Sequence, residues 1–211
     1  DHAVLEKKGF LLVDSGATYM DGTTDITRTY PLGPLTEDEK RFYTWTLQSH
    51  IDLAKAVWLD YCECKMIDTI AREPLWRHLI NYRCGTGHSV SFVGNVHEGP
   101  HALNGRNTTL MRPGMVVTDE PGVYETDLVG IRIENELVCV HKADNHHGTF
   151  LGFVPLMFVP IATSPILPGV LDKDEIAWLN DYHRQVFAKL APHLNDEERS
   201  WLAEKCAAIG C

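Results

Sequence analysis

The chain has 211 residues, 44% of them hydrophobic and 23% charged, which is typical of one folded globular domain or of one domain with an appendage. Its formal net charge of −10 argues against nucleic acid or an anionic membrane surface as a partner, because both select basic proteins. The longest apolar run, LGFVPLMFVPIA, is too short for a membrane span and contains two prolines. We therefore expect neither a nucleic-acid nor a membrane partner.

The N-terminal third predicts a β-hairpin followed by two helices. Residues 9–14 (GFLLVD) indicate a buried strand, residues 16–22 a turn with glycine at both ends, and DITRTYPLG a second strand. A capping box at Thr36 precedes an apolar periodic run from about Lys40 to Trp58. A second helix is expected from Lys65 to about Ile80, with a break or kink at Pro74.

The remainder predicts strands and then a helical tail. Residues 83–141 contain short β-branched runs separated by glycine and proline, which indicates antiparallel strands. The polar stretch 141–150 is expected to be a boundary loop, and residues 151–169 are expected to be extended. One helix begins at Asp172 and another follows Asn195. The layout is α+β, with residues 1–145 as one domain and 146–211 as a C-terminal extension.

The cysteines and the N-terminus bear on localisation. Six cysteines form no CxxC pair and no regular spacing, so reduced thiols in a cytoplasmic protein are the simplest interpretation. No signal peptide is recognisable, and the sequence begins with Asp1 instead of Met. We interpret it as a trimmed or fragmentary chain.

Five side chains with oxygen or nitrogen donors lie at strand ends, close to glycine or proline. They are Asp14, Asp25, His88, Glu120 and Glu134. Buried carboxylates repel one another unless a cation neutralises them, so these five together match a site for two divalent metals. Oxygen-rich ligation with a single histidine favours Mn²⁺, and Co²⁺ or Zn²⁺ can substitute. Taken singly, however, an aspartate at a strand end is more simply explained as a turn or cap residue.

The order of the motifs adds a resemblance to a known family. VDSG, DITRT, GTGH, VHEGP, TDEPG and GIRIEN follow one another along the chain. This series resembles the metallopeptidases of the pita-bread fold and, within that group, the Xaa-Pro aminopeptidases (aminopeptidase P). The segment GTGHSVSFVGNVHEGP and the tail FVPLMFVPI…WLNDYHRQV resemble the cytosolic type and its C-terminal extension. The resemblance covers nearly the whole chain and implies an α+β pita-bread fold.

The resemblance gives each of the five donors a role. Asp14 matches an aspartate that chelates one metal, Asp25 and Glu134 match carboxylates that bridge both metals, and His88 matches the single histidine ligand. Glu120 matches the first glutamate ligand, which also accepts a proton from the attacking water. Two divalent ions, with Mn²⁺ favoured, are therefore the implied cofactors.

Further residues match positions around the metals. His97, in VHEGP, matches a histidine that binds substrate and stabilises the tetrahedral intermediate, and Arg132 matches an arginine that orients carboxylates. His101 follows His97 by four residues and is a candidate for binding substrate in the same cleft, with a plain loop histidine as the alternative. We expect His146 and His147, in the polar stretch, to be solvated.

The implied activity is removal of the N-terminal residue from peptides with proline in second position, by a water activated by two metals. One alternative is a prolidase, which cleaves only Xaa-Pro dipeptides, although the helical tail favours the aminopeptidase. The other is a non-catalytic binding module on the same fold. Such relatives usually lose metal ligands, whereas all five are present here. Because the family's tail often carries a dimer contact, a homodimer is also expected.

The match departs from the family pattern at two places. Family members carry more chain upstream, including a histidine that contacts substrate, so we expect the catalytic domain to be incomplete on its N-terminal side. His2 does not match that histidine, because its surroundings (DHAVLEKKG) lack the expected apolar and aromatic residues. In addition, Cys84 stands four residues before His88, where some relatives have a histidine.

Overall fold

The computed structural model of the protein describes residues 4–210. The interpretation of His2 and the state of Cys211 therefore lie outside the described residues. The other five cysteines are free thiols, as expected. Within residues 4–210, no helix combines the length and the apolar character needed to cross a membrane.

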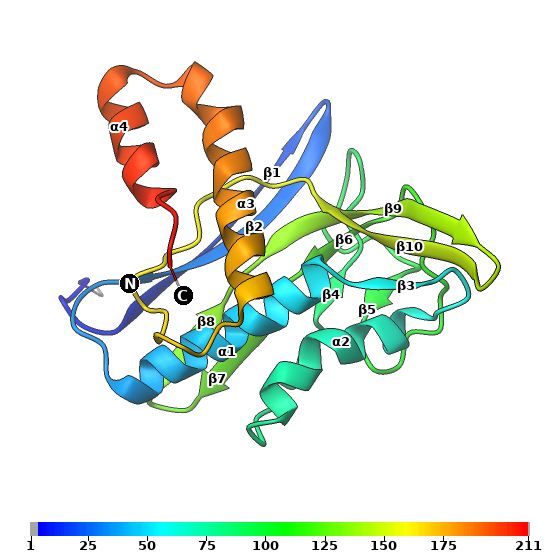
Figure 1. Cartoon of the computed structure of the whole chain (residues 1–211), viewed down its shortest axis with the longest axis horizontal. Helices are drawn as coiled ribbons and strands as arrows, with labels where there is room; N and C mark the ends of the chain where they lie inside the picture. The colour runs from blue at the N-terminus through cyan, green and yellow to red at the C-terminus, as the bar shows by residue number, and fades with distance from the viewer. Residues whose placement is uncertain (1–3, 211) are drawn as a thin grey trace.

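The chain forms two strands, then two helices with a short strand between them, then a long run of strands and a helical C-terminal end, which is the predicted α+β arrangement (Figure 1). The strands are β1 (Phe10–Tyr19), β2 (Gly22–Pro31), β3 (Val57–Leu59), β4 (Gly87–His88), β5 (Ala102–Leu103), β6 (Val116–Asp119), β7 (Gly122–Glu125), β8 (Val129–Arg132), β9 (Asn135–Asn145) and β10 (Gly148–Pro155). The helices are α1 (Glu37–Ala54), α2 (Cys64–Trp76), α3 (Lys173–Leu190) and α4 (Asp196–Lys205), with a 3₁₀ turn at Ala191–His193.

One antiparallel sheet organises the central part of the fold. Its strand order is β3–β10–β9–β6, and the remaining strands form the pairs β1–β2, β4–β5 and β7–β8. A bridge between Ser89 and Val117 joins the β4–β5 pair to β6. Buried apolar side chains of α1 and α2 pack against this sheet: Leu53 and Ile67 lie in one core cluster with Leu137 of β9. The β4 segment is thereby fixed beside the end of β6.

A second core joins the C-terminal region to the rest of the molecule. Helix α3 stands across α1, with α4 beside it (Figure 1). Leu47 and Ile51 of α1 pack with Ile131 of β8 and Leu179 of α3, and all four are fully buried. This core holds β8, which carries Arg132, against the helices.

The N-terminal hairpin is longer than predicted. β1 and β2 pair along their whole length around a turn at Met20 and Asp21, so the predicted turn at 16–22 is wrong for residues 16–19. Gly16 is required by the close approach of the two strands, because a Cβ there would lie 2.6 Å from the carbonyl oxygen of Thr24. Some glycines are needed because two backbones come close together, and in the sequence such a glycine cannot be told from a turn glycine.

The helix starts are predicted well and the helix ends poorly. Capping boxes are present at Thr36, Asp172 and Asn195, where side chain and backbone hydrogen-bond reciprocally. The first helix ends at Ala54 and not at Trp58, because residues 57–59 pair with β10 instead. The second helix ends two residues after Pro74, not at Ile80.

The predicted boundary loop at 141–150 is wrong. Strands β9 and β10 continue through it as a hairpin, with His146 and His147 at the turn. Both histidines are exposed, as expected. Residues 141–148 are exposed throughout, so the apolar alternation that signals a strand is missing, and the two strands pair through their backbone hydrogen bonds.

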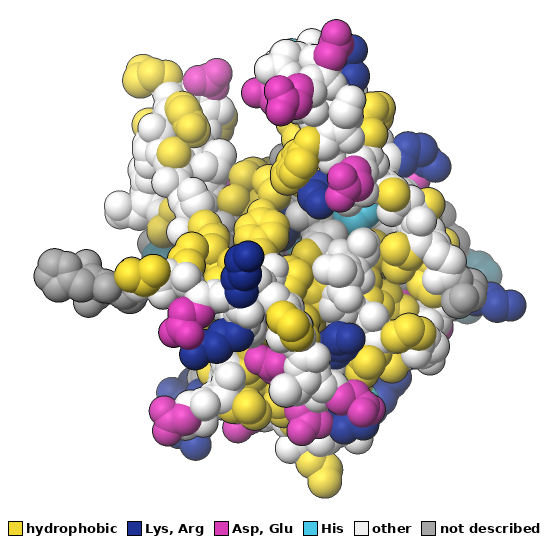
Figure 2. All heavy atoms as spheres, turned by 90° about the vertical axis from the view of Figure 1, so that its left-hand side faces the viewer, with side chains coloured by type: hydrophobic (Ala, Val, Ile, Leu, Met, Phe, Trp, Pro, Cys, Tyr) yellow, Lys and Arg dark blue, Asp and Glu magenta, His cyan; other side chains and the backbone are white. Residues whose placement is uncertain are grey.

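The face that carries α4 has a mixed surface. Figure 2 shows apolar side chains gathered over the middle of that face, with many Asp and Glu side chains toward its edges. Among the large hydrophobic residues, Leu5 and Trp201 are 67% and 57% exposed. The ligand candidates lie elsewhere, in the cavity described next.

Candidate metal centre

The hairpin places Asp14 and Asp25 on one face. Asp14 is paired with Thr27, and Gly16 is paired with Asp25. Because side chains alternate between the two faces of a strand, all four of these residues share a face. The two carboxylates are therefore diagonal neighbours across the hairpin, although eleven positions separate them in sequence.

His88 presents one ring nitrogen to the carboxylates. Its Nδ1 lies 2.6 Å from the carbonyl oxygen of Val96, which can only accept, so Nδ1 carries the donated hydrogen. Its Nε2 lies 3.2 Å from Oε1 of Glu120 and 3.4 Å from Oδ2 of Asp25. Second partners that fix the tautomer in this way are typical of metal-ligating histidines.

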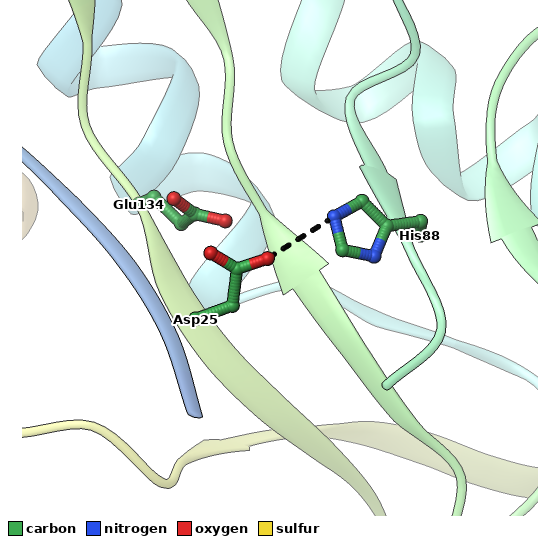
Figure 3. A group of neighbouring side chains, drawn as sticks. All are labelled: Asp25, His88 and Glu134. Atoms are coloured by element: carbon green, nitrogen blue, oxygen red, sulfur yellow. Dashed lines mark ion pairs between the residues drawn. The ribbon is translucent and has the colours of Figure 1, made fainter. Parts of the chain in front are cut away.

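The two glutamates stand at the ends of strands. Glu120 follows β6, and Oγ1 of Thr118 donates to its Oε1 at 3.0 Å. Glu134 lies between β8 and β9, is 1% exposed, and accepts a 2.5 Å hydrogen bond from Oγ1 of Thr27. The donor atoms of Asp25, His88 and Glu134 all lie within 4.8 Å of one another, and Figure 3 shows the two carboxylates side by side with the imidazole facing Asp25.

Burial and mutual repulsion disfavour the charged forms of the glutamates in this cluster. Burial, together with the charges of Glu120, Asp25 and Asp14, raises the pKa of Glu134 to about 8. Burial also raises the pKa of Glu120, against the effect of His88. Burial opposes protonation of His88, but its hydrogen bonds to Asp25 and to backbone carbonyls raise its pKa to about 9. Crowded carboxylates that retain protons fit a divalent metal, which would replace those protons.

Arg132 lies between the half-exposed Asp14 and the more buried Glu120. Its Nη2 lies 2.5 Å from Oδ2 of Asp14, and its Nε donates to Oγ1 of Thr27 at 3.1 Å. Nε also lies 3.8 Å from Oε2 of Glu120, and Nη1 donates to the hydroxyl of Tyr124 at 3.0 Å. The guanidinium therefore lies within ion-pair distance of the carboxylates of Asp14 and Glu120.

The two other histidines differ in position. His97 is exposed and stacks on His88, with ring centroids 3.8 Å apart. Burial and the nearby His88 lower the pKa of His97. His101 is directed away from the cluster, because its Nε2 donates to the carbonyl of Val116 at 2.8 Å. The structure thus brings His97, but not His101, to the predicted ligands.

The ligand candidates share one cavity of about 860 Å³. Its lining includes all five predicted ligands together with His97 and Cys84, whereas His101 is not part of it. Thr18, Thr23 and Asn95 add hydroxyl and amide groups to the walls. A cavity of this size accommodates a short peptide.

Two hydroxyl groups at the site were not predicted, although the sequence contained a signal for them. Thr27 stands two residues after Asp25, and Thr118 stands two residues before Glu120. In a strand this spacing places two side chains on the same face. No short spacing in the sequence predicts the contacts among Arg28, Asn135 and Tyr182, because these residues are distant from one another in sequence.

Comparison with known proteins places the chain in a family. The sequence model of metallopeptidase family M24 matches residues 1–141, and the model of the C-terminal region of peptidase M24 matches residues 149–209. A probable Xaa-Pro aminopeptidase P of Coprinopsis cinerea is 40% identical over 99% of this chain. Aminopeptidase P1 of Lotus japonicus is 42% identical over 99% of it.

Solved structures agree with these matches. The X-prolyl aminopeptidase of Caenorhabditis elegans, described as a cytosolic enzyme with a di-nuclear active site, superimposes with a TM-score of 0.89 at 40% identity over 94% of this chain. The prolidase of Pyrococcus furiosus gives 0.60 at 29% identity over 71%. The chain spans 35% and 32% of the two relatives above and 33% of the C. elegans structure. It therefore belongs to metallopeptidase family M24, with the pita-bread fold of that family.

Proposed function

We propose that this chain is the metal-binding catalytic part of an Xaa-Pro aminopeptidase, which removes the N-terminal residue from peptides with proline in second position. Two divalent ions would be held by Asp14, Asp25, His88, Glu120 and Glu134. One observation carries the proposal: side chains from four separate segments converge on one cavity, with Nε2 of His88 directed at the carboxylates. The M24 match and the aminopeptidase P relatives support it.

The remaining groups of the cavity supply the proton transfers and the substrate contacts. When bound, the two ions would lower the pKa of a water molecule and polarise the substrate carbonyl. Glu120 would accept the proton of the attacking water and pass it to the leaving imino nitrogen. His97, stacked on His88 at the cavity, would donate a hydrogen bond to the developing oxyanion. Arg132 would keep Asp14 oriented.

The finer assignments belong to the same proposal. An oxygen-rich donor set with one histidine supports Mn²⁺ as the metal, with Co²⁺ or Zn²⁺ as substitutes. Free thiols and the cytosolic C. elegans neighbour support a cytoplasmic location. The net charge supports the absence of nucleic-acid and membrane partners. A homodimer, a catalytic domain at 1–145 with an extension at 146–211, and substrate binding by His101 stay predictions.

Two alternatives are less well supported. A prolidase would act only on dipeptides, and the prolidase neighbour covers less of the chain than the aminopeptidase, which extends into the C-terminal region. A non-catalytic module on this fold would not need a preserved ligand set. Here all five candidates line the same cavity.

The test compares this chain with a form extended upstream to the length of its relatives. Both are stripped with a chelator, titrated with Mn²⁺ and analysed for metal content. The extended form is then assayed on an Xaa-Pro-Xaa tripeptide, an Xaa-Pro dipeptide and an Xaa-Ala-Xaa control. We expect two ions per chain and cleavage of the proline tripeptide, both lost in Asp25→Asn. Cleavage of the dipeptide alone would indicate a prolidase, and absence of metal binding in both forms would refute the enzyme.

A further inference from the structure

A buried polar network lies behind the metal cavity, between β6, β9 and α1. Asp119 and Asn135 are paired across β6 and β9, are fully buried, and directly adjoin Glu120 and Glu134 in sequence. Nδ2 of Asn135 lies 3.2 Å from Nε2 of His50, whose Nδ1 lies 3.1 Å from Oδ2 of Asp119. Because neighbouring residues of an extended chain project to opposite sides, the network occupies the side away from the ligands.

Arg28 connects this network to the backbone of Glu134. Its side chain is 3% exposed, and its Nη1 donates to the carbonyl of Thr27 at 2.9 Å and to the carbonyl of Glu134. Its Nη2 donates to Oδ1 of Asn135 at 2.8 Å. The N–H of Glu134 donates to the carbonyl of Thr27 at 3.1 Å. Both backbone polar groups of Glu134 are therefore held from β2, the strand that carries Asp25.

Tyr182, on α3, contacts the same guanidinium nitrogen of Arg28 as Asn135 does. Its side chain is 1% exposed, and its hydroxyl lies 2.9 Å from Nη2 of Arg28 and 3.2 Å from Oδ1 of Asn135. The N–H of Val159 donates to this hydroxyl at 3.2 Å, and the carbonyl of Val159 accepts from Nη2 of Arg28 at 2.7 Å. The ring stacks in parallel on Trp178, with centroids 5.4 Å apart. Packing thus fixes where the hydroxyl points.

We propose that Tyr182 is a positioning residue of the metal centre. Its hydroxyl, through Arg28 and Asn135, fixes the backbone at Glu134 and so the carboxylate that this residue presents to the metals. The inference rests on the proposed metal-binding function. Its physical basis is that a ligand set works only when held to within about 0.5 Å, and that a guanidinium with all its N–H groups engaged cannot move without breaking hydrogen bonds.

The chain contains a matched control for a purely structural effect. Tyr43 is also 1% exposed, and its hydroxyl donates to the carbonyl of Ala162, in the segment that leads to α3. That hydrogen bond is 2.6 Å long and does not involve Arg28. Tyr43→Phe therefore removes a buried hydroxyl of the same kind, whereas Tyr182→Phe also removes the link to Glu134.

The first experiment measures metal binding by the 211-residue chain and the two variants. After removal of metal, each protein is titrated with Mn²⁺ in a calorimeter, and its visible absorption is recorded with Co²⁺. We expect Tyr182→Phe to weaken at least one site about tenfold and to change the Co²⁺ spectrum, as loss of contacts behind a ligand typically does. Tyr43→Phe should leave both readouts unchanged.

Two results would overturn the inference while leaving the metal site intact. The first is unchanged affinity and spectrum in Tyr182→Phe. The second is an equal loss of affinity in both variants, in proportion to their lower melting temperatures. If the unaltered chain binds no metal, the proposed function itself fails, and that outcome is separate from the other two.

A second measurement needs no variant. Coupling between two sites is reciprocal, so metal binding should also stabilise the segment that contacts Tyr182. In the unaltered chain, Mn²⁺ should slow hydrogen exchange at the N–H of Val159, which donates to the Tyr182 hydroxyl. The N–H of Arg199, bonded within α4 to Asn195, should exchange at an unchanged rate. Unchanged exchange at Val159, with two ions bound, would contradict the coupling.

Discussion

Two buried groups of charged side chains in this protein differ in how completely their charges are paired within the chain. On α2, Asp68 is 1% exposed and its Oδ2 accepts from Nε of Arg72 at 2.8 Å, while the Thr86 hydroxyl donates to Oδ1. The remaining Arg72 donors reach the carbonyls of Tyr82 and Cys84, both at 2.8 Å. In this group the chain supplies its own cation and satisfies every charge.

The metal cluster is neutralised only in part, because four carboxylates share one imidazole and one guanidinium, those of His88 and Arg132. Glu134 receives one hydroxyl hydrogen bond but no cation, and its pKa rises to about 8 because it is buried near other carboxylates. The guanidinium of Arg132 is paired with Asp14 at the more exposed side, and that of Arg28 donates to the backbone carbonyl of Glu134 and not to its carboxylate. The two groups are thus of different kinds. In the first every charge has a partner within the chain, whereas in the second the carboxylates outnumber the cations, which is the pattern expected of a ligand site.

The largest expected effect comes from breaking the complete pair. Asp68→Asn leaves the buried Arg72 without its counter-ion, which should lower the free energy of unfolding by about 3–5 kcal/mol. Urea unfolding of the metal-free chain measures this loss. Glu73→Gln is the matched control, because Glu73 pairs with Arg77 on the same helix with the same i,i+4 spacing but in solvent. A similar loss in both variants would contradict the comparison.

Metal binding should stabilise the incomplete cluster. At a free Mn²⁺ concentration of about 100 times Kd, each site adds about 2.7 kcal/mol to the free energy of unfolding. For a chain of this size, one such site raises Tm by about 5–10 °C. Thermal melts with and without a chelator test this, and Asp68→Asn should keep the full gain because its pair lies outside the cluster. Stoichiometric binding with no change in Tm would refute it.

The metal-free chain should lose stability as the pH rises. The pKa of Glu134 is higher when folded, about 8, than its ordinary value of 4.5, so its contribution is fully present below pH 4.5 and is lost as the pH rises to 8. His88, with its pKa raised to about 9, acts in the same direction above pH 6.5. We expect a loss on the order of 2 kcal/mol between pH 5 and 8.

Melts in the presence of a chelator measure this pH dependence. Glu134→Gln should weaken it, because glutamine does not titrate and can still accept the hydrogen bond from Thr27. If the metal-free chain became more stable toward pH 8, the predicted repulsion among the carboxylates of the cluster would be contradicted. A slope that is unchanged in Glu134→Gln would assign the effect to other groups.

The smallest effect on stability is expected at the exposed side of the cluster. The Asp14 side chain is 50% exposed, so Asp14→Asn should change the free energy of unfolding by less than about 1 kcal/mol, despite the contact with Arg132. Metal content should nevertheless fall from two ions to one, because Asp14 is proposed to chelate a single metal. Asp21→Asn, at the exposed hairpin turn, is the control and should retain both ions. Retention of both ions in Asp14→Asn would remove that residue from the ligand set.

Local signals in the sequence account for much of the fold. The helix starts at Thr36 and Asp172 were predicted because a capping box is formed by residues three positions apart, and the helix after Asn195 was predicted as well. The end of α1 was not predicted, because residues 57–59 pair with β10, which lies far away in sequence. The strand at 141–145 was not predicted, because its exposed residues carry no apolar alternation. Pairing partners override local preference in such segments.

For the site, the sequence by itself determined which residue types stand at which motif positions, and the ordered motifs were enough to name the ligand candidates and the family. Only the tertiary structure decided that His97 reaches the ligands while His101 turns to Val116, and that Tyr182 contacts Arg28. The physical reason is that burial, hydrogen-bond direction and charge crowding arise from segments brought together by folding. The chain order of those segments does not encode the angles at which their side chains meet.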